Sequence, residues 1–472
     1  MSAQANEAAP RAESDPTLRR ALAIVPAAIL LTWPALLNRY PLLYPDSIGY
    51  LQDGRPIAAA LFLHRLQNFT AQRAELYSLG ILPFHWNLTP WPIVALNALL
   101  TAYVLWLTVI SIQPRNPARH YLLLVALLSL FTSVSWFVSL LMPDLLGALL
   151  YLGIYLLIFA RESLSRGERY ALALIAFWSI TAHATHLVLA AGLCILLALL
   201  LALRWGPIAH RGRALAQIAA LVAVAAAAQL ALHAYLYGRP SLDGSRPPYL
   251  MARIIADGPG REYLVQHCVK LDWAICDRVH NGVADLPDND DAFLWEPGGV
   301  WPGASKATQQ RLLAEEMPLV RATLRAYPRE QLARSFANFT RQLDDFGVND
   351  FDNNAWMQGA LGNVLRGAQP RYLGSLQARD AVPSNRFTIL QRWIVILSAL
   401  LLAALLPWLV RQRRQRLLGL VVAVVPTLIA NAFVTAVLSS SDSRYQARVI
   451  WLIPLLAALA ALDWLNQRQE HI

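Results

Sequence analysis

One carboxylate stands just past the first long apolar run of the chain, in the stretch Tyr44-Pro-Asp-Ser-Ile-Gly-Tyr50. If the preceding run, 21–37, crosses a membrane, Asp46 is expected at the membrane surface. A carboxylate in that position can take a proton from a substrate hydroxyl, and the nearby Tyr50 can contact the same substrate. The alternative is an ordinary interfacial loop in which Tyr44 and Tyr50 belong to an aromatic belt. Asp46 is therefore a candidate catalytic residue.

A second carboxylate, Asp144, follows Pro143 at a tight turn between two apolar runs. A charge this close to hydrocarbon is costly, so it usually has a partner or a task. Aspartate is also a good helix N-cap, and capping the run that follows is the alternative role. The two roles are compatible, and Asp144 is the second candidate catalytic residue.

Two histidines, His183 and His186, lie three residues apart at another short polar turn, and so on one side of the chain if the turn is helical. Imidazoles there could bind phosphate, polarise an acceptor, or ligate a metal together with a carboxylate. Two histidines alone do not make a metal site. We therefore predict a structural or substrate-binding role, no metal site and no cofactor, although a divalent metal is left open.

The stretch 439–448 is expected to form a loop that brings Arg444, Tyr445 and Arg448 to the mouth of a helical bundle. Arginine suits phosphate because its planar fork donates two hydrogen bonds at once. The alternative is that these arginines extend to lipid headgroups. Within an earlier loop, 38–90, further unranked candidates are Asp53, Arg55, His64, Arg65 and His85, of which Arg55 is predicted to bind substrate.

The composition indicates a membrane protein. Hydrophobic residues make up 56% of the chain, charged residues 15%, and the mean hydropathy is +0.40. The net charge of +10 comes almost wholly from arginine, since Lys270 and Lys306 are the only lysines. Because many arginines lie in short loops between apolar runs, they indicate membrane orientation rather than binding to nucleic acid. The first apolar run has no small-residue cleavage site after it, so we expect a retained span.

Ten apolar runs come close enough to the roughly 20 residues that a membrane helix needs to be candidate spans. The run 170–203 is too long for one helix and short for two. Arginines flank it on both sides, so both ends favour the cytoplasm and the run must turn back, at 181–186. The same rule places both termini in the cytoplasm. The expected spans are 21–37, 91–112, 121–142, 144–160, 170–182, 186–203, 214–235, 389–410, 417–438 and 449–465.

The predicted fold is thus an all-α polytopic membrane protein with a bundle over 21–235, three further spans over 389–465, and short cytoplasmic tails at 1–20 and 466–472. Loop 38–90 is expected to lie in the membrane interface. Between the two sets of spans, 236–388 is expected to form a mainly helical extracytoplasmic domain.

Within that domain, apolar residues recur at helical spacing over 308–342, where Pro318 and Pro328 are expected to kink or break the helix. Its three tryptophans should fill the core or line a groove. Cys268 and Cys276 are close enough to form a disulfide if the segment is extracytoplasmic; the alternative is two buried free thiols. The apolar residues at helical spacing are Leu312, Leu313, Met317, Val320, Leu324, Leu332, Phe336 and Phe339, and the tryptophans are Trp273, Trp295 and Trp301.

The charged residues stand at the ends of the apolar runs rather than at mid-depth. Transporters place their binding groups near the bilayer midplane, usually within repeats, so the pattern favours an enzyme whose site lies at the outer interface. Two other classes stay open. One is a lipid or solute translocator, and the other is a non-enzymatic scaffold whose extracytoplasmic domain binds a partner.

This layout resembles the GT-C superfamily of integral-membrane glycosyltransferases, which includes protein O-mannosyltransferases and the aminoarabinose transferases that modify lipid A. The resemblance rests on Asp46 after the first span with Tyr50 four residues on, the interfacial first outer loop, Asp144 at the next outer turn, a histidine hairpin, and Arg444-Tyr445 before the last span. It covers the membrane part, 21–235 and 389–465, and adds nothing about the activity of 237–388.

The resemblance implies a polyprenyl-phosphate-linked sugar as donor, an acceptor glycan, lipid or protein, and transfer on the extracytoplasmic face of a bacterial inner membrane. The catalytic carboxylate of the family would correspond to Asp46. Ser47 stands where several relatives carry a second acidic residue, so a metal site like that of some members is not implied.

Overall fold

The computed structural model describes residues 16–66, 74–113, 117–242, 244, 246–280, 283–349, 351 and 355–470. The described chain is almost entirely helical, with one short hairpin of β1 (Val279–His280) and β2 (Val283–Ala284). Six segments are long and apolar enough to cross a membrane, which makes the chain an all-α integral membrane protein. They are α5 (Trp91–Ile112), α10 (Ala184–Ala202), α11 (Gly212–Tyr237), α19 (Ser384–Arg411), α20 (Gln415–Leu438), and Ser443–Gln469, which comprises α21 (Ser443–Ile450) and most of α22 (Leu452–Glu470).

Three of the other predicted spans are shorter or divided. The first consists of α1 (Pro16–Leu31) and α2 (Trp33–Asn38). Pro34, in the first turn of α2, has no backbone N–H, so it cannot continue the hydrogen bonding of α1. The third consists of α6 (Pro117–Phe131) and α7 (Val134–Ser139). The fourth is α8 (Leu145–Phe159), whose fifteen residues are all buried. A short helix suffices there because the bundle surrounds it.

The predicted turn within 170–203 is present. Helix α9 (Arg166–Thr181) ends and α10 begins within the predicted stretch, with His183 as the N-cap of α10. The Nδ1 atom of His183 accepts a hydrogen bond from the backbone N–H of Thr185 at 3.3 Å, which satisfies one of the unpaired donors at the helix start.

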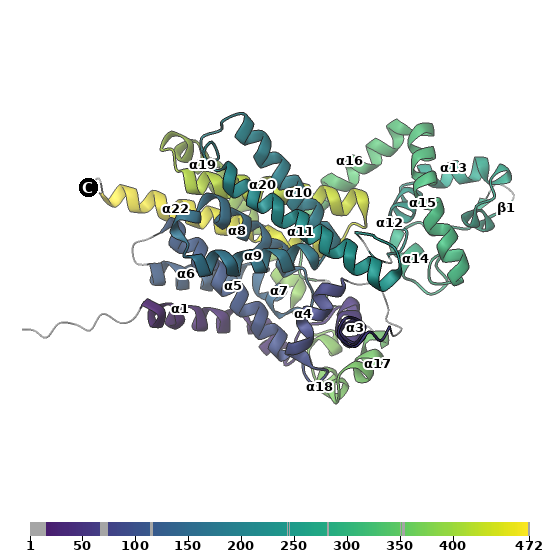
Figure 1. Ribbon diagram of the computed structural model, residues 1–472, viewed down its shortest axis with the longest axis horizontal. Helices are drawn as coiled ribbons and strands as arrows, with labels where there is room; N and C mark the ends of the chain where they lie inside the picture. The colour runs from purple at the N-terminus through teal and green to yellow at the C-terminus, as the bar shows by residue number, and fades with distance from the viewer. Residues whose placement is uncertain are drawn as a thin grey trace, which may run out of the picture.

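The two ends of the bundle differ (Figure 1). The start of α1 and the end of α22 lie at one end, and the helices of the 236–388 segment extend from the other. Helices α3 (Pro45–Leu63) and α4 (Glu75–His85) pack against each other at that second end. Figure 1 shows α3 nearly end-on while α11, α20 and α22 run across the view, so α3 lies across the bundle axis. This arrangement suits helices that lie in the membrane interface.

The structure divides the segment 236–388 into two parts. The first contains α12 (Tyr249–Ala256), α13 (Pro259–His267), α14 (Asp290–Leu294) and α15 (Lys306–Ala326), which share a core of their own, and α16 (Pro328–Asp344), whose buried side chains are polar. The second contains α17 (Ala355–Val364) and α18 (Ala368–Leu373), whose buried side chains join the core of the bundle. Only the first part is therefore a separate packing unit.

Within the first part, Pro328 separates α15 from α16 as expected, whereas Pro318 lies inside α15. The apolar residues at helical spacing differ in burial. Leu312 is buried, but Met317 and Leu324 are about two-fifths exposed, and Leu332 and Phe336 are each 66% exposed. Of the three tryptophans, Trp301 is buried and Trp295 is exposed at the surface.

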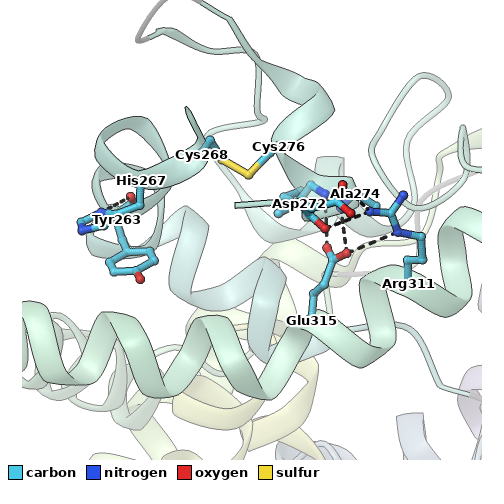
Figure 2. The surroundings of a disulfide bond; sticks show 9 residues. Tyr263, His267, Cys268, Asp272, Ala274, Cys276, Arg311 and Glu315 are labelled. Carbon is cyan, nitrogen blue, oxygen red and sulfur yellow. Dashed lines mark hydrogen bonds and ion pairs between the residues drawn. A yellow bond between two sulfur atoms is a disulfide. The ribbon is translucent and has the colours of Figure 1, made fainter. Parts of the chain in front are cut away.

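Cys268 and Cys276 form a disulfide, with their Cα atoms 5.3 Å apart (Figure 2). The Glu315 carboxylate of α15 lies beside the bridge and accepts hydrogen bonds from the backbone N–H groups of Ala274, at 2.7 Å, and Ile275, at 3.2 Å. A carboxylate at these unpaired N–H groups caps the short 3-10 helix Ala274–Arg278. The disulfide loop is thereby anchored to the longest helix of the domain.

Candidate functional site

A buried cluster of three charges lies where α8 meets α21. Arg444 Nη1 donates to both carboxylate oxygens of Asp144, at 3.3 and 3.2 Å, and Arg448 Nη1 donates to Asp144 Oδ1 at 3.3 Å. The three residues are 5% exposed or less. Their contact joins residues about 300 positions apart in the chain.

The structure corrects the expected loop at 439–448. Helix α21 begins at Ser443, because the side chain of Asp442 caps it by accepting from the backbone N–H of Arg444 at 2.8 Å. Arg444 and Arg448 are four residues apart and so share one helix face. That face points into the protein, so these arginines do not extend to lipid headgroups.

Asp144 is the residue before α8, yet its side chain makes no capping hydrogen bond within the described structure. Its carboxylate instead faces the two arginines. Of the two roles that the sequence left open, the structure shows the one with a charged partner. Asp144 thus joins the two arginines of α21 to the start of α8.

Asp46 lies in the first turn of α3 rather than in a loop. The hydroxyl of the buried Ser47 accepts from the backbone N–H of Tyr44 at 2.9 Å and donates to the carbonyl of Leu141 at 2.8 Å. Ser47 thereby ties the start of α3 to the turn that carries Asp144. Ser47 therefore has a structural role at this position.

The same end of α3 is fixed from the second part of the 236–388 segment. The side-chain amide of Gln377 accepts from the backbone N–H of Leu43 at 3.1 Å and donates to the carbonyl of Leu43 at 2.6 Å. These two hydrogen bonds position the residues that lead into Asp46.

Aromatic rings connect Asp46 to the charged cluster. The guanidinium carbon of Arg444 lies 4.1 Å from the ring centroid of Tyr44 and 5.0 Å from that of Tyr445. The half-buried Asp46 lies within electrostatic reach of the Tyr445 hydroxyl. Tyr50, predicted to contact substrate, is 4% exposed and packs edge-to-face on Tyr77 at 4.8 Å, which is a core position.

Residues near the turn between α9 and α10, and one residue of α20, also contact Arg448. Arg448 Nη2 lies 3.4 Å from the hydroxyl of Thr185 and 3.0 Å from the side-chain oxygen of Asn431. His186 is fully buried, its Nδ1 lies 2.8 Å from the carbonyl oxygen of Ser179, and its ring is within electrostatic reach of Arg448. The sequence analysis missed Thr185 and Asn431. For Asn431, the available signal was its position as a polar residue inside the apolar run 417–438.

Several buried polar atoms beside this cluster have no hydrogen-bond partner among the described residues. They are Nε of Arg448, Nε2 of His186, and the hydroxyls of Tyr77 and Tyr151. Burial and the nearby Asp144 carboxylate raise the pKa of Tyr77 well above its ordinary value, so its hydroxyl stays protonated. Unpartnered buried polar atoms indicate where water or a ligand supplies the missing hydrogen bonds.

The cluster and its rim bring two arginines and two carboxylates together. Two guanidinium groups face one carboxylate, and Asp442, 3.8 Å from Arg444 Nη2, is a partly exposed carboxylate at the rim. Arginine suits an anion such as phosphate because its planar fork donates two hydrogen bonds at once. Across the described ranges, no three histidine, cysteine or acidic side chains gather as metal ligands.

Arg55 lies outside this cluster. It is nine residues beyond Asp46 on α3, about 13 Å along the helix, and donates to the carbonyl of Trp86 at 3.0 Å. A pocket of about 420 Å³ opens beside it, with Asn87 and Arg366 in its wall. The other candidates of the first loop are also apart from one another, since Asp53 and His85 are buried whereas His64 and Arg65 are exposed.

No family model matches the chain, and neither the curated proteins nor the solved structures include a match.

We expect Gly147→Ala to destabilise the site. A Cβ at Gly147 would lie 2.9 Å from Nε2 of His186, so the ring must move. Overpacking of this kind costs about 1 to 3 kcal/mol. Unfolding of the variant in mixed detergent micelles measures the cost, and Gly153→Ala on the same helix is the matched control because its Cβ would meet nothing within 4 Å. Equal stability of the two variants would contradict the close packing of His186.

His85 predicts a pH dependence of stability. Burial, together with the nearby Arg55, lowers the pKa of His85 from 6.5 to about 4, and its Nδ1 accepts from the backbone N–H of Asn87 at 3.0 Å. The folded state thus holds His85 neutral while the unfolded chain takes up a proton below pH 6.5. Stability is therefore lost as pH falls from about 6.5 towards 4, by roughly 2 kcal/mol at pH 5.

The measurement is the unfolding free energy of the protein and of His85→Asn between pH 7.5 and 5. Asparagine keeps an acceptor near the Asn87 N–H but does not titrate. The difference between the two proteins should shift in favour of the variant as pH falls. A difference that stays constant over this range would show that His85 is not held neutral.

Proposed function

We propose that this protein is a membrane glycosyltransferase that moves a sugar from a polyprenyl-phosphate donor to an acceptor at the end of the bundle that carries Asp46. The observation that carries the proposal is the buried arginine pair on Asp144, beside the half-buried Asp46. An anion site next to a carboxylate is what transfer from a phosphate leaving group requires. The resemblance of the sequence layout to GT-C glycosyltransferases supplies the reaction class.

The proposed topology has ten spans, both termini in the cytoplasm, and the site on the extracytoplasmic face of a bacterial inner membrane. Three observations support it. The start of α1 and the end of α22 lie away from the α12–α16 domain, as Figure 1 shows. The Cys268–Cys276 disulfide suits an oxidising compartment. Short helices such as α8, which lie inside the bundle, need not match the full bilayer thickness.

In the proposed reaction, the acceptor hydroxyl oxygen forms a bond to the anomeric carbon as the bond from that carbon to the phosphate oxygen breaks. Asp46 takes the hydroxyl proton, and the electron pair of the broken bond leaves on the polyprenyl phosphate. A single displacement of this kind inverts the configuration of the sugar.

The arginines would stabilise the charge that grows on the leaving phosphate. Asp144 then acts as a positioning residue, because its carboxylate is already shared by the two guanidinium groups that it holds in place. His183 and Tyr445 stand at the edge of the same cluster and are proposed to contact the donor. Arg55, at its separate pocket, has no assigned part in the reaction.

The experiment is to reconstitute the purified protein in lipid nanodiscs with a panel of polyprenyl-phosphate-linked sugars and to measure release of polyprenyl phosphate by mass spectrometry. The proposal predicts release from one donor class, faster when an acceptor is added. A translocator would instead move lipid or solute across proteoliposomes without breaking it, and would keep that activity in Asp46→Asn. A scaffold would show neither activity and would depend only on the α12–α16 domain.

A further inference from the structure

Helix α16 buries polar side chains and exposes apolar ones, the reverse of an ordinary surface helix. Its buried side chains are polar: Gln331, Asn338 and Gln342. Two of its large apolar side chains, Leu332 and Phe336, are each 66% exposed. A surface helix normally buries its apolar stripe, so this exposed stripe requires a different environment on its outer side.

The buried polar face has specific partners. The side-chain amides of Gln331 and Asn338 donate to the two carboxylate oxygens of Asp257, at 2.7 and 2.8 Å. Gln342 donates to the carbonyl of Asp442 at 2.8 Å and accepts from its backbone N–H at 3.0 Å. These contacts fix the rotation of α16 about its axis, so the outward direction of the apolar stripe is set by the fold.

The outer stripe is continuous and one-sided. Leu332, Phe336, Phe339 and Leu343 follow one another at spacings of four, three and four, which places them on one face of a helix. The exposed Arg334 and Arg341 lie two and nine positions beyond Leu332, about 180 to 200° around the helix. The helix therefore presents an apolar side and, opposite to it, a charged side.

The stripe continues the membrane-facing surface of the bundle. The ring centroid of Phe339 lies 6.0 Å from that of Phe433, which is on the spanning helix α20. Phe433 and Ile429 are each 48% exposed on that helix, and Phe433 is five residues from its end. Figure 1 shows α16 leaving that end of the bundle at an oblique angle.

We propose that the outer stripe of α16, defined as Leu332, Phe336, Phe339 and Leu343, is a lipid-binding surface that rests in the leaflet next to the site. Its partner is the acyl-chain region of the bilayer, with Arg334 and Arg341 turned to water. Because Gln342 holds Asp442, the residue that caps the arginine helix, a helix seated in lipid also braces the rim of the site. The lipid contact itself does not depend on the reaction proposed above.

The experiment places one nitroxide label at a time on the full chain in phosphatidylcholine nanodiscs that hold a single copy. Cys194 is replaced by alanine, since it is the free cysteine and the other two form the disulfide. Labels at Leu332→Cys and Phe336→Cys report on the stripe, and labels at Arg334→Cys and Arg341→Cys are the matched controls on the opposite side. Power saturation compares accessibility to oxygen, which concentrates in lipid, with accessibility to a water-soluble nickel chelate.

The proposal predicts that oxygen accessibility exceeds nickel accessibility at positions 332 and 336, more so at 336, which lies nearer α20, and that the order reverses at 334 and 341. Nickel accessibility that dominates at all four positions would place the stripe in water and overturn the proposal. Low accessibility to both reagents at 332 and 336 would show that protein covers the stripe, which also overturns it. Because each nanodisc holds one copy, a second copy cannot cause that result.

Discussion

Replacing Asp46 by asparagine is expected to lower the rate of sugar transfer by about 100 to 10,000-fold, because the reaction loses its general base while the helix start keeps its shape. Ser47 makes hydrogen bonds that hold the first turn of α3 to the turn at Leu141, and the substitution leaves them in place. The variant should therefore fold and insert normally. The measurement is release of polyprenyl phosphate per molecule of correctly folded protein.

The matched control for this variant is Asp288→Asn. That side chain is 94% exposed in the α12–α16 domain, so its loss should leave the rate unchanged. An Asp46→Asn protein that unfolds like the unmodified chain and still transfers sugar at the full rate would rule out Asp46 as the base. It would leave the arginine cluster as an anion site of another kind.

Asp144→Asn is expected to destabilise the protein by about 3 to 5 kcal/mol, because it leaves two buried guanidinium groups without their shared counter-charge. Asparagine has nearly the shape of aspartate, so the loss measures charge rather than volume. Unfolding in mixed detergent micelles gives the free energy. The exposed ion pair of Asp288 with Arg261 provides the comparison, and Asp288→Asn should cost less than about 1 kcal/mol.

A double-mutant cycle separates this charge effect from general damage. Adding Arg448→Gln to Asp144→Asn removes one of the two uncompensated charges, so the double variant should be more stable than the sum of the single effects predicts. Additive losses, or an Asp144→Asn variant within about 1 kcal/mol of the unmodified protein, would mean that the cluster is not held together by charge.

The sequence predicted the turn within 170–203 but not the pairing of the candidate residues. Arginines on both sides of 170–203 required a turn, and the turn lies where the polar residues allowed it. Nothing local could show that Asp144 binds Arg444 and Arg448, because the partners are about 300 residues apart. The same limit hid Thr185 and Asn431, which look neutral until a guanidinium group is placed beside them.

The errors in the predicted elements have local causes. The polar run before Arg444 was taken for a loop, but Asp442 caps a helix there, so the arginines turn inward. Apolar residues at helical spacing correctly predicted helices over 308–342, yet spacing cannot tell protein from lipid as the neighbour. Leu332 and Phe336 fit the predicted helical spacing, and each is 66% exposed.

The central claim is that the arginine pair on Asp144 and the carboxylate of Asp46 face the phosphate and sugar of one lipid-linked donor. The most direct test is an experimental structure of the protein in nanodiscs with a polyprenyl-phosphate sugar bound. We expect the phosphate to lie against Arg444 or Arg448, with the anomeric carbon on the Asp46 side. A phosphate bound away from both arginines, for example in the pocket beside Arg55, would contradict the proposed mechanism and leave the fold standing.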